Sequence, residues 1–249
     1  MTAGAIAAVL GAVFVTAVIS GAFGMAGGLL LMGVLTFALP VAAAMAVHGI
    51  TQVTSNAARV GLHIGHVRWR TTGVFGIGAL IAMAVFGAVV ATPSKAVVFL
   101  GLGLLPIAIW LPERWVGLDP TRPSHSLAAG FVSTAVSLVT GISGPLTDLF
   151  LTQGKLTRHQ MVATKASLQI FGHLAKIVVY GGAILGGDAA AAPWPLIAGA
   201  AVLAVAGATL GGRLLDRFSD EGFRKWRRWI FTAIGATYLV QAARLFLGA

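Results

Sequence analysis

The sequence predicts an all-α integral membrane protein, a polytopic helix bundle of eight to ten membrane segments with short or broken helices after glycine-rich turns. The composition is that of a protein that folds in lipid: 57% of the 249 residues are hydrophobic and only 10% are charged, and the mean hydropathy is +0.91. Apolar stretches follow one another along the chain, and at ~20 residues per span there is room for roughly eight to ten of them. A polar pattern in the first half recurs in the second, which indicates two repeats.

Each half contains five apolar segments. In the first half they cover residues 4–22, 29–39, 41–65, 73–91 and 95–111. In the second half they cover residues 127–140, 145–154, 157–182, 194–213 and 229–247. We interpret the first segment as a membrane helix, because a secretory signal carries basic residues before its apolar run and none are present here.

Two of the segments, 29–39 and 145–154, are only about ten residues long and each follows a glycine-rich break. At ~1.5 Å per residue they are too short for a full crossing, so we expect half-helices or strongly tilted pieces. If both cross, the count is ten and the second repeat is inverted relative to the first. If neither crosses, the count is eight and the repeats are parallel.

Two ridges of polar side chains carry the repeat. They lie 117 residues apart, and in each the intervals are four, four and three residues, so in a helix all four side chains share one face. The first ridge is His48, Gln52, Asn56 and Arg59, and the second ridge is Lys165, Gln169, His173 and Lys176. Residues 14–59 align without a gap with residues 131–176, which indicates an internal duplication. We therefore expect a first membrane repeat at 1–115, a hydrophilic linker at 116–125 and a second repeat at 126–249.

The basic loop residues predict the orientation. If every segment crosses once, all but Lys95 fall on one side, which the positive-inside rule makes cytoplasmic, and both termini are then extracytoplasmic. Ten crossings thus give the inverted repeats that secondary transporters use for alternating access. The basic residues on the cytoplasmic side are Arg68, Arg70, Arg114, Arg122, Lys155, Arg158, Arg213, Arg217, Arg224, Lys225, Arg227 and Arg228.

Composition also narrows the functional class. The net charge is +10, but the basic residues are spread over several short loops, so we expect no nucleic-acid partner. The chain has no cysteine and therefore no disulfide, thiolate metal site or thiol nucleophile. His63 and His66 lie near Arg68 without a further suitable ligand close in sequence, so we expect interfacial histidines and no metal site. No cofactor is expected.

The two ridges are the candidate site for an anion. A cation inside a bilayer costs at least ~2.5 kcal/mol, so Arg59, Lys165 and Lys176 need partners. Asp148 is the one acidic residue in a predicted membrane segment, so an incoming anion is the expected counter-charge. The amides and imidazoles of the ridges could bind its oxygens. Backbone N–H groups after the glycine-rich breaks are predicted to add donors, at Gly24, Gly27, Gly141 and Gly144.

Structural alternatives exist for several of these residues. Arg59 and Lys176 could extend to the membrane interface, and Gln52 and Gln169 could simply link helices through amide hydrogen bonds. Asp148 could pair with Lys165 or Lys176, or could carry a proton. His48 and His173 are the other candidates for proton coupling, because imidazole titrates near neutral pH.

The motifs GMAGGLLL at 24–31 and GISGPLTD at 141–148, each followed by a short apolar piece, a turn and a helix, resemble the sulfite exporter TauE/SafE family of membrane anion transporters. The family usually shows a fuller triple-glycine turn; here Ala26 replaces a glycine, and the second copy contains Ser143 and Pro145. The segment after Pro40 reads AVHGITQ, with a histidine where the family tends to have small residues.

The resemblance implies a secondary transporter in the bacterial cytoplasmic membrane for a small sulfur oxyanion or organosulfonate, such as sulfite or thiosulfate. An anion channel is one alternative. An intramembrane enzyme is another, because serine, histidine and aspartate occur on neighbouring segments, but no nucleophile lies in a recognisable turn. Paired halves with broken helices favour a carrier over both.

Overall fold

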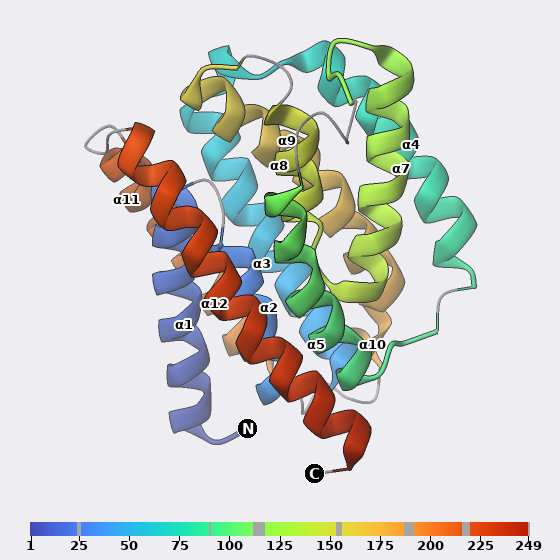
Figure 1. Ribbon diagram of the computed structural model, residues 1–249. Helices are drawn as coiled ribbons and strands as arrows, with labels where there is room; N and C mark the ends of the chain where they lie inside the picture. Colours follow the sequence, from blue (N-terminus) through green and yellow to red (C-terminus); the bar gives the residue numbers. More distant parts are fainter. Residues whose placement is uncertain are drawn as a thin grey trace.

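The computed structural model describes residues 1–23, 26–89, 91–111, 118–152, 156–186, 192–215 and 220–248. These residues form a bundle of helices with no β-strand among them, which confirms the predicted all-α membrane fold (Figure 1). The helices of the first half are α1 (Ala3–Phe23), α2 (Gly27–Ala38), α3 (Val41–Leu62), η1 (Ile64–His66), α4 (Trp69–Gly87), α5 (Lys95–Leu104) and η2 (Leu105–Trp110). Those of the second half are α7 (Pro123–Thr140), α8 (Gly144–Thr152), α9 (Arg158–Tyr180), α10 (Gly182–Leu185), α11 (Trp194–Leu215) and α12 (Asp220–Leu247).

Corresponding helices of the two halves run in opposite directions. In Figure 1, α1 rises from the N-terminus at the lower end, whereas its counterpart α7 descends from the upper end. The helices α3 and α9 are likewise antiparallel, and both chain termini lie at the lower end. The last helix, α12, begins nine residues before the predicted segment 229–247.

The halves interlock and do not form separate bodies. Helix α1 packs against α11 of the other half, and the equivalent pair, α7 and α4, packs in the same way. Helices α3 and α9 pack against each other, as do α5 and α12. Each of these pairings joins one half to the other, so the folded unit needs both repeats.

Glycine permits this close packing. A methyl group at Gly130 of α7 would lie 2.0 Å from the carbonyl oxygen of Phe75 in α4, and one at Gly211 of α11 would lie 2.2 Å from the carbonyl oxygen of Val18 in α1. Backbones that approach so closely exclude any side chain, and such contacts are a common source of helix association in lipid.

Helices α2 and α8 are the short pieces that the sequence predicts, with 12 and 9 residues. A methyl at Gly27 would overlap the carbonyl oxygen of Thr16, two turns before the end of α1, so α2 begins part-way along α1 and inside the bundle. The turn before α2 places Ala26 at a φ of 68°. Positive φ favours glycine, the residue that the resemblance expects at this position.

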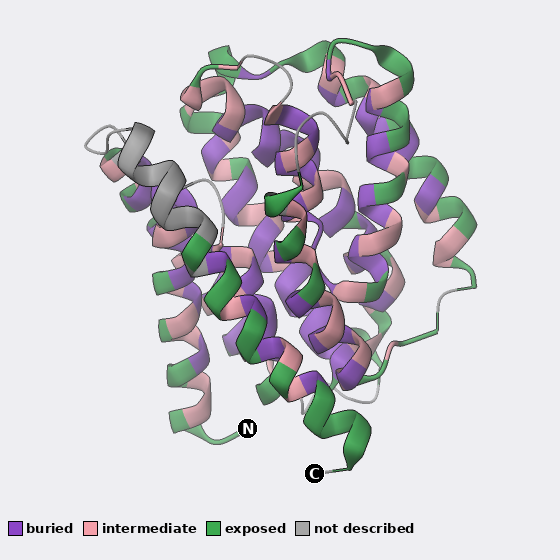
Figure 2. Ribbon diagram, in the orientation of Figure 1, coloured by how far each residue is buried: buried purple, intermediate pink, exposed green. Residues whose placement is uncertain are grey.

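The outer faces of the bundle are apolar. Figure 2 shows exposed residues on the outward sides of the helices and buried residues between them. Large apolar side chains such as Val178 and Val202 are about two-thirds exposed, as expected of a surface covered by lipid. Three helices among the described residues are long and apolar enough to span a membrane, α1, α4 and α11. Helices α3 and α9 carry the polar ridges on the faces that they turn toward the interior.

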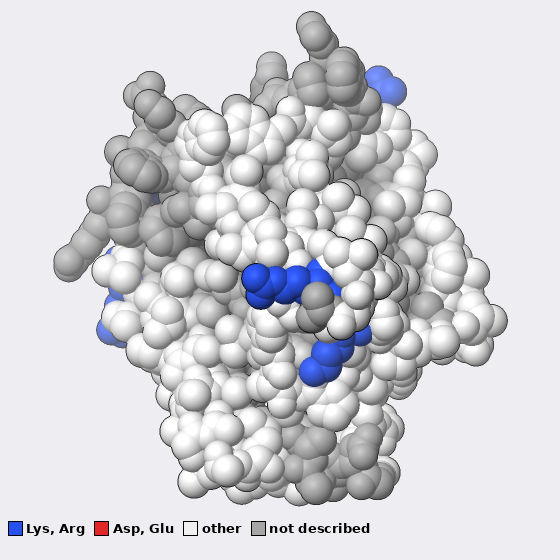
Figure 3. All heavy atoms as spheres, turned by 60° about the horizontal axis from the view of Figure 1, so that its bottom comes forward, with Lys and Arg blue, Asp and Glu red and all other residues white. Residues whose placement is uncertain are grey.

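The two ends of the helix bundle carry different sets of basic residues. The end that holds both termini is turned forward in Figure 3, and its described surface shows a few basic side chains and no acidic one. At the opposite end lie the described residues Arg68, Arg70, Arg122, Arg158 and Arg213. Arg114, Lys155 and Arg217 lie outside the described residues, as do the side chains of Arg224, Lys225, Arg227 and Arg228.

The linker closes with a small polar turn before α7. Asp119 accepts hydrogen bonds from the Thr121 hydroxyl at 2.6 Å and from the Thr121 backbone N–H at 2.8 Å. These bonds, together with Arg122 at 3.7 Å, stabilise the carboxylate and lower the pKa of Asp119. The charged form of Asp119 therefore helps to position the start of α7.

Candidate functional site

The two polar ridges face each other where α3 and α9 cross. A methyl at Gly49 would lie 3.0 Å from the carbonyl oxygen of His173, so the two backbones nearly touch there. The rings of His48 and His173 lie 5.4 Å apart, and Lys176 Nζ is 2.6 Å from His48 Nδ1. Residues 128 positions apart in sequence are thereby brought into direct contact.

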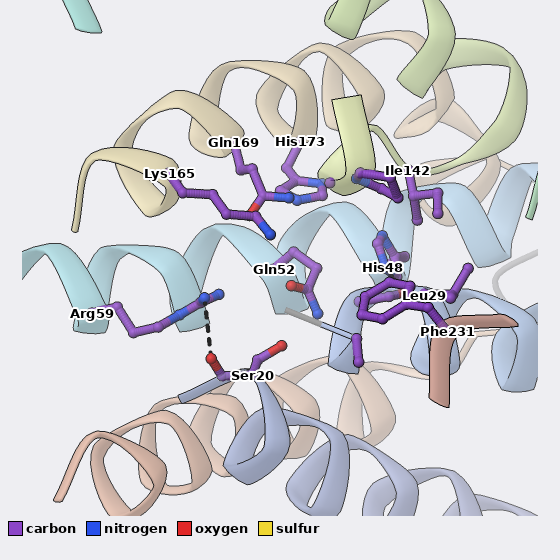
Figure 4. Close-up of a pocket in the computed structure, with 14 residues that line it drawn as sticks. Ser20, Leu29, His48, Gln52, Arg59, Ile142, Lys165, Gln169, His173 and Phe231 are labelled. Atoms are coloured by element: carbon purple, nitrogen blue, oxygen red, sulfur yellow. Dashed lines mark hydrogen bonds between the residues drawn. The ribbon is translucent and has the colours of Figure 1, made fainter. Parts of the chain in front are cut away.

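A cavity of about 30 Å³ lies between the ridges. A water molecule needs ~10–15 Å³ of cavity volume measured in this way, so the cavity is large enough for about two waters. Six ridge residues line it, namely His48, Gln52, Arg59, Lys165, Gln169 and His173 (Figure 4). The other two, Asn56 and Lys176, are buried and contact lining residues: Asn56 accepts a hydrogen bond from Arg59, and Lys176 contacts His48.

The cavity also contacts the first turns of α2 and α8. A methyl at Gly28 would lie 3.4 Å from Gln52 Oε1, and one at Gly144 would lie 3.3 Å from Gln169 Nε2. Each ridge glutamine therefore lies against the N-terminal turn of the short helix in its own repeat. Free N–H groups and the positive end of the helix dipole make two such termini an environment that favours negative charge.

The four glycines predicted to contact the anion have different positions. Gly144 lines the cavity, whereas Gly27 packs against Thr16 of α1 and Gly28 lines the cavity in its place. Gly141 ends α7 with a φ of 83°, and its carbonyl oxygen accepts a hydrogen bond from Lys176. Gly24 lies outside the described residues.

Arg59 and Lys176 are interior cations, with 2% and 0% of their surface exposed, and neither extends to the membrane interface. Arg59 donates to the Ser20 carbonyl near the end of α1, and Lys176 donates to the Gly141 carbonyl at the end of α7. The two cations occupy equivalent repeat positions, and each neutralises part of the negative end of a helix. Among the contacts in the described part of the chain, the Arg59 guanidinium meets only neutral acceptors.

Lys165 already has a carboxylate partner. Its Nζ lies 2.7 Å from Asp148 Oδ2 of α8, and both side chains are almost completely buried. Of the partners considered for Asp148, the structure selects Lys165. Lys165 therefore has a counter-charge before any anion binds. For Arg59, an incoming anion is still the expected counter-charge.

The two imidazoles have different hydrogen-bonding roles. The Gly28 carbonyl can only accept, so His48 Nε2–H donates to it at 2.9 Å, and beside a charged Lys176 the His48 Nδ1 is the acceptor of a neutral ring. His173 is buried, and its Nδ1 has no partner among the described residues. The buried Asn56 Nδ2 and Ser137 Oγ also lack one. Because His173 lines the cavity, its unsatisfied ring nitrogen indicates a place for a polar ligand there.

The sulfite exporter TauE/SafE family matches residues 9–238, nearly the whole chain. The chain belongs to the sulfite exporter TauE/SafE family. Comparisons with curated proteins and with solved structures give no significant match. Membership of the TauE/SafE family identifies a membrane transport protein.

Sequence reasoning missed several residues of the cavity in this TauE/SafE protein. Ser20, Ala26, Leu29 and Ile142 line it, as does Phe231 of α12. Small and apolar residues give no signal of a site in a membrane sequence. Gly28 could have been found, because it lies one residue from Gly27, which aligns with Gly144.

A third histidine lies beside His63 and His66 at the upper end of the bundle. The ring of His159, at the start of α9, lies 5.5 Å from that of His63 and 5.3 Å from that of His66. The sequence does not suggest this third ring, because it is almost a hundred residues away. No group of residues in the described part of this TauE/SafE chain is arranged to hold a metal ion.

Proposed function

We propose that this protein is a secondary transporter that moves a small sulfur-containing anion across the bacterial cytoplasmic membrane by alternating access. The anion binds in the cavity between α3 and α9, against Arg59, Gln52 and Gln169 and the N-terminal turns of α2 and α8. The observation that carries the proposal is the buried Arg59, a cavity-lining cation whose described contacts are all neutral.

Electrostatics supports an anion as the ligand. A buried charge without a counter-charge costs several kcal/mol, so a site that keeps Arg59 ionised is stabilised by a negative guest. Two amides beside the cavity and two converging helix N-termini can replace the water that the anion loses.

The size of the cavity supports a small anion. A volume that holds about two waters admits a compact oxyanion with modest side-chain movement, and longer organosulfonates would need a larger rearrangement. Sulfite and thiosulfate fit this requirement better than extended sulfonates.

The arrangement of the repeats supports alternating access. The site lies between halves whose equivalent helices run in opposite directions, so exchanging the conformations of the two halves would open it to the other side. With the basic loops in the cytoplasm, both termini are extracytoplasmic and the chain crosses the membrane ten times.

Proton coupling is a separate part of the proposal. The ring of His173 lies 5.4 Å from that of His48 and lines the same cavity as Arg59, whose positive charge disfavours a second one in the empty site. A bound anion reverses that balance, so a proton on His173 and an anion in the cavity favour each other. His48 is less suited to this role, because its neutral tautomer is held by Lys176 and Gly28. Asp148 could accept a proton only by leaving its pair with Lys165.

Flux measurements with a matched pair of arginine variants test the function. In proteoliposomes, uptake of labelled thiosulfate or sulfite by the wild type should saturate and be inhibited by the unlabelled anion. Arg59→Gln should reduce uptake at least about tenfold, because it removes an unpaired charge from the site. Arg70→Gln removes the same charge from an exposed helix end and should keep wild-type uptake.

Two results would contradict the proposal. Wild-type flux that rises linearly with anion concentration, without saturation, would indicate a channel. If the Arg59→Gln variant takes up the anion at the wild-type rate, the cavity is not the anion-binding site.

A further inference from the structure

The two repeats reach the same net interior charge with different numbers of charged side chains. Among the described residues, four acidic, lysine or arginine side chains are buried, and the charge balance follows from their ordinary charged forms: Arg59, Asp148, Lys165 and Lys176. In the second repeat, Lys165 and Asp148 neutralise each other. At the equivalent positions of the first repeat stand His48, which is neutral, and Leu31, which is apolar. Each repeat therefore contributes one net positive charge, Arg59 from the first and Lys176 from the second.

We propose that the site selects a small anion with two negative charges, and that Asp148 sets this selectivity by cancelling the charge of Lys165. This inference rests on the proposed function and specifies the charge of its substrate. The Asp148 carboxylate does not line the cavity, so it acts through Lys165, which does.

The balance of charge is the reason for the selectivity. Electrostatic interactions between buried groups are strong because the interior has a low dielectric constant, so the complex is most stable when the guest cancels the net charge of its surroundings. A dianion neutralises the two repeats together. A monoanion, including an organosulfonate with one charge, leaves one buried cation uncompensated.

Two compact anions of different charge provide the test. Thiosulfate carries two charges near neutral pH, and methanesulfonate is similar in shape and carries one. Dissociation constants are measured for purified full-length protein at pH 8, where the imidazoles are neutral. The selectivity is the dissociation constant for methanesulfonate divided by that for thiosulfate, and in the wild type it should be about ten or more.

Charge-changing variants should move this ratio in opposite directions. Lys176→Gln lowers the net interior charge to one and should reduce the ratio about tenfold or more. Asp148→Asn raises the net charge to three and should increase the ratio. The double variant Asp148→Asn/Lys176→Gln restores two net charges and should return the ratio to within about threefold of the wild type. Arg70→Gln removes an exposed charge and should leave it unchanged.

The outcomes separate this inference from the proposed function. If the wild type binds neither anion nor sulfite, the proposed function fails. If the wild type binds both anions with equal affinity, or if the double variant keeps the low ratio of Lys176→Gln, the charge selectivity fails while the transporter assignment stands. The wild-type ratio requires no variant, so a misfolded variant does not prevent the test.

Discussion

At the scale of single residues, the protein holds three cations in its interior by three different means. Arg59 and Lys176 donate to carbonyls at helix ends, and Lys165 pairs with a carboxylate. Neutral acceptors satisfy hydrogen bonds without cancelling charge, whereas Asp148 cancels it. The first two cations therefore keep most of their attraction for an anion, and the third keeps less.

Breaking the Lys165–Asp148 pair should destabilise the protein. Asp148→Ala leaves a buried cation without a counter-charge, which costs about 3–5 kcal/mol. Replacing both residues with apolar side chains of similar size, Lys165→Met together with Asp148→Leu, should recover most of that loss. Thermal unfolding of the anion-free protein in detergent measures both effects. Equal melting temperatures for the wild type and Asp148→Ala would show that the pair makes no net contribution to stability.

The proposed role of His173 predicts the pH dependence of anion binding. A proton on this ring adds a positive charge next to the cavity, so anion affinity should rise as the pH falls through the range in which the ring titrates. The variant His173→Gln should lose this dependence and keep binding at high pH. Thiosulfate dissociation constants between pH 5 and pH 8 provide the measurement, and the same slope in both proteins would assign the proton elsewhere.

At the scale of elements, the short helices α2 and α8 determine where the site lies. Both begin inside the bundle, so their N-terminal turns meet the ridges of α3 and α9 in the interior. A continuous helix would place its N-terminus at the membrane surface, where water already satisfies it. The glycine-rich breaks therefore move two helix termini to the depth of the cavity.

Two glycine substitutions distinguish binding from packing. In Gly144→Ala the new methyl lies 3.3 Å from the flexible Gln169 amide, so we expect near-native stability and anion affinity reduced about tenfold. In Gly130→Ala the methyl lies 2.0 Å from the Phe75 backbone carbonyl, so the helices must separate and stability should fall. Melting temperature and thiosulfate binding are measured for both. Loss of stability in Gly144→Ala with intact binding would reverse this assignment.

At the scale of the whole molecule, every major helix pairing joins one repeat to the other. The equivalent contacts α1–α11 and α4–α7 leave α3 and α9 at the centre, where the two ridges share one cavity. Neither repeat could form the site alone, because each contributes one ridge and one short helix.

The proposed orientation can be tested by thiol labelling, because the chain has no cysteine. Thr92 lies in the exposed loop before α5, and Ser124 lies at the exposed start of α7, at opposite ends of the molecule. A membrane-impermeant maleimide applied to intact cells should label Thr92→Cys and not Ser124→Cys. The reverse pattern would place both termini in the cytoplasm.

The sequence by itself determined the membrane environment, the short helices and the two ridges. These follow from local composition and from periodicity within single helices, which the residue order records directly. Only the tertiary structure decided that Asp148 pairs with Lys165, that Lys176 contacts His48, and that Gly28 and Phe231 line the cavity. Those contacts depend on how α3 and α9 cross and how deep α2 and α8 begin. Crossing and depth are set by packing between residues far apart in the chain, for which spacing along one helix carries no signal.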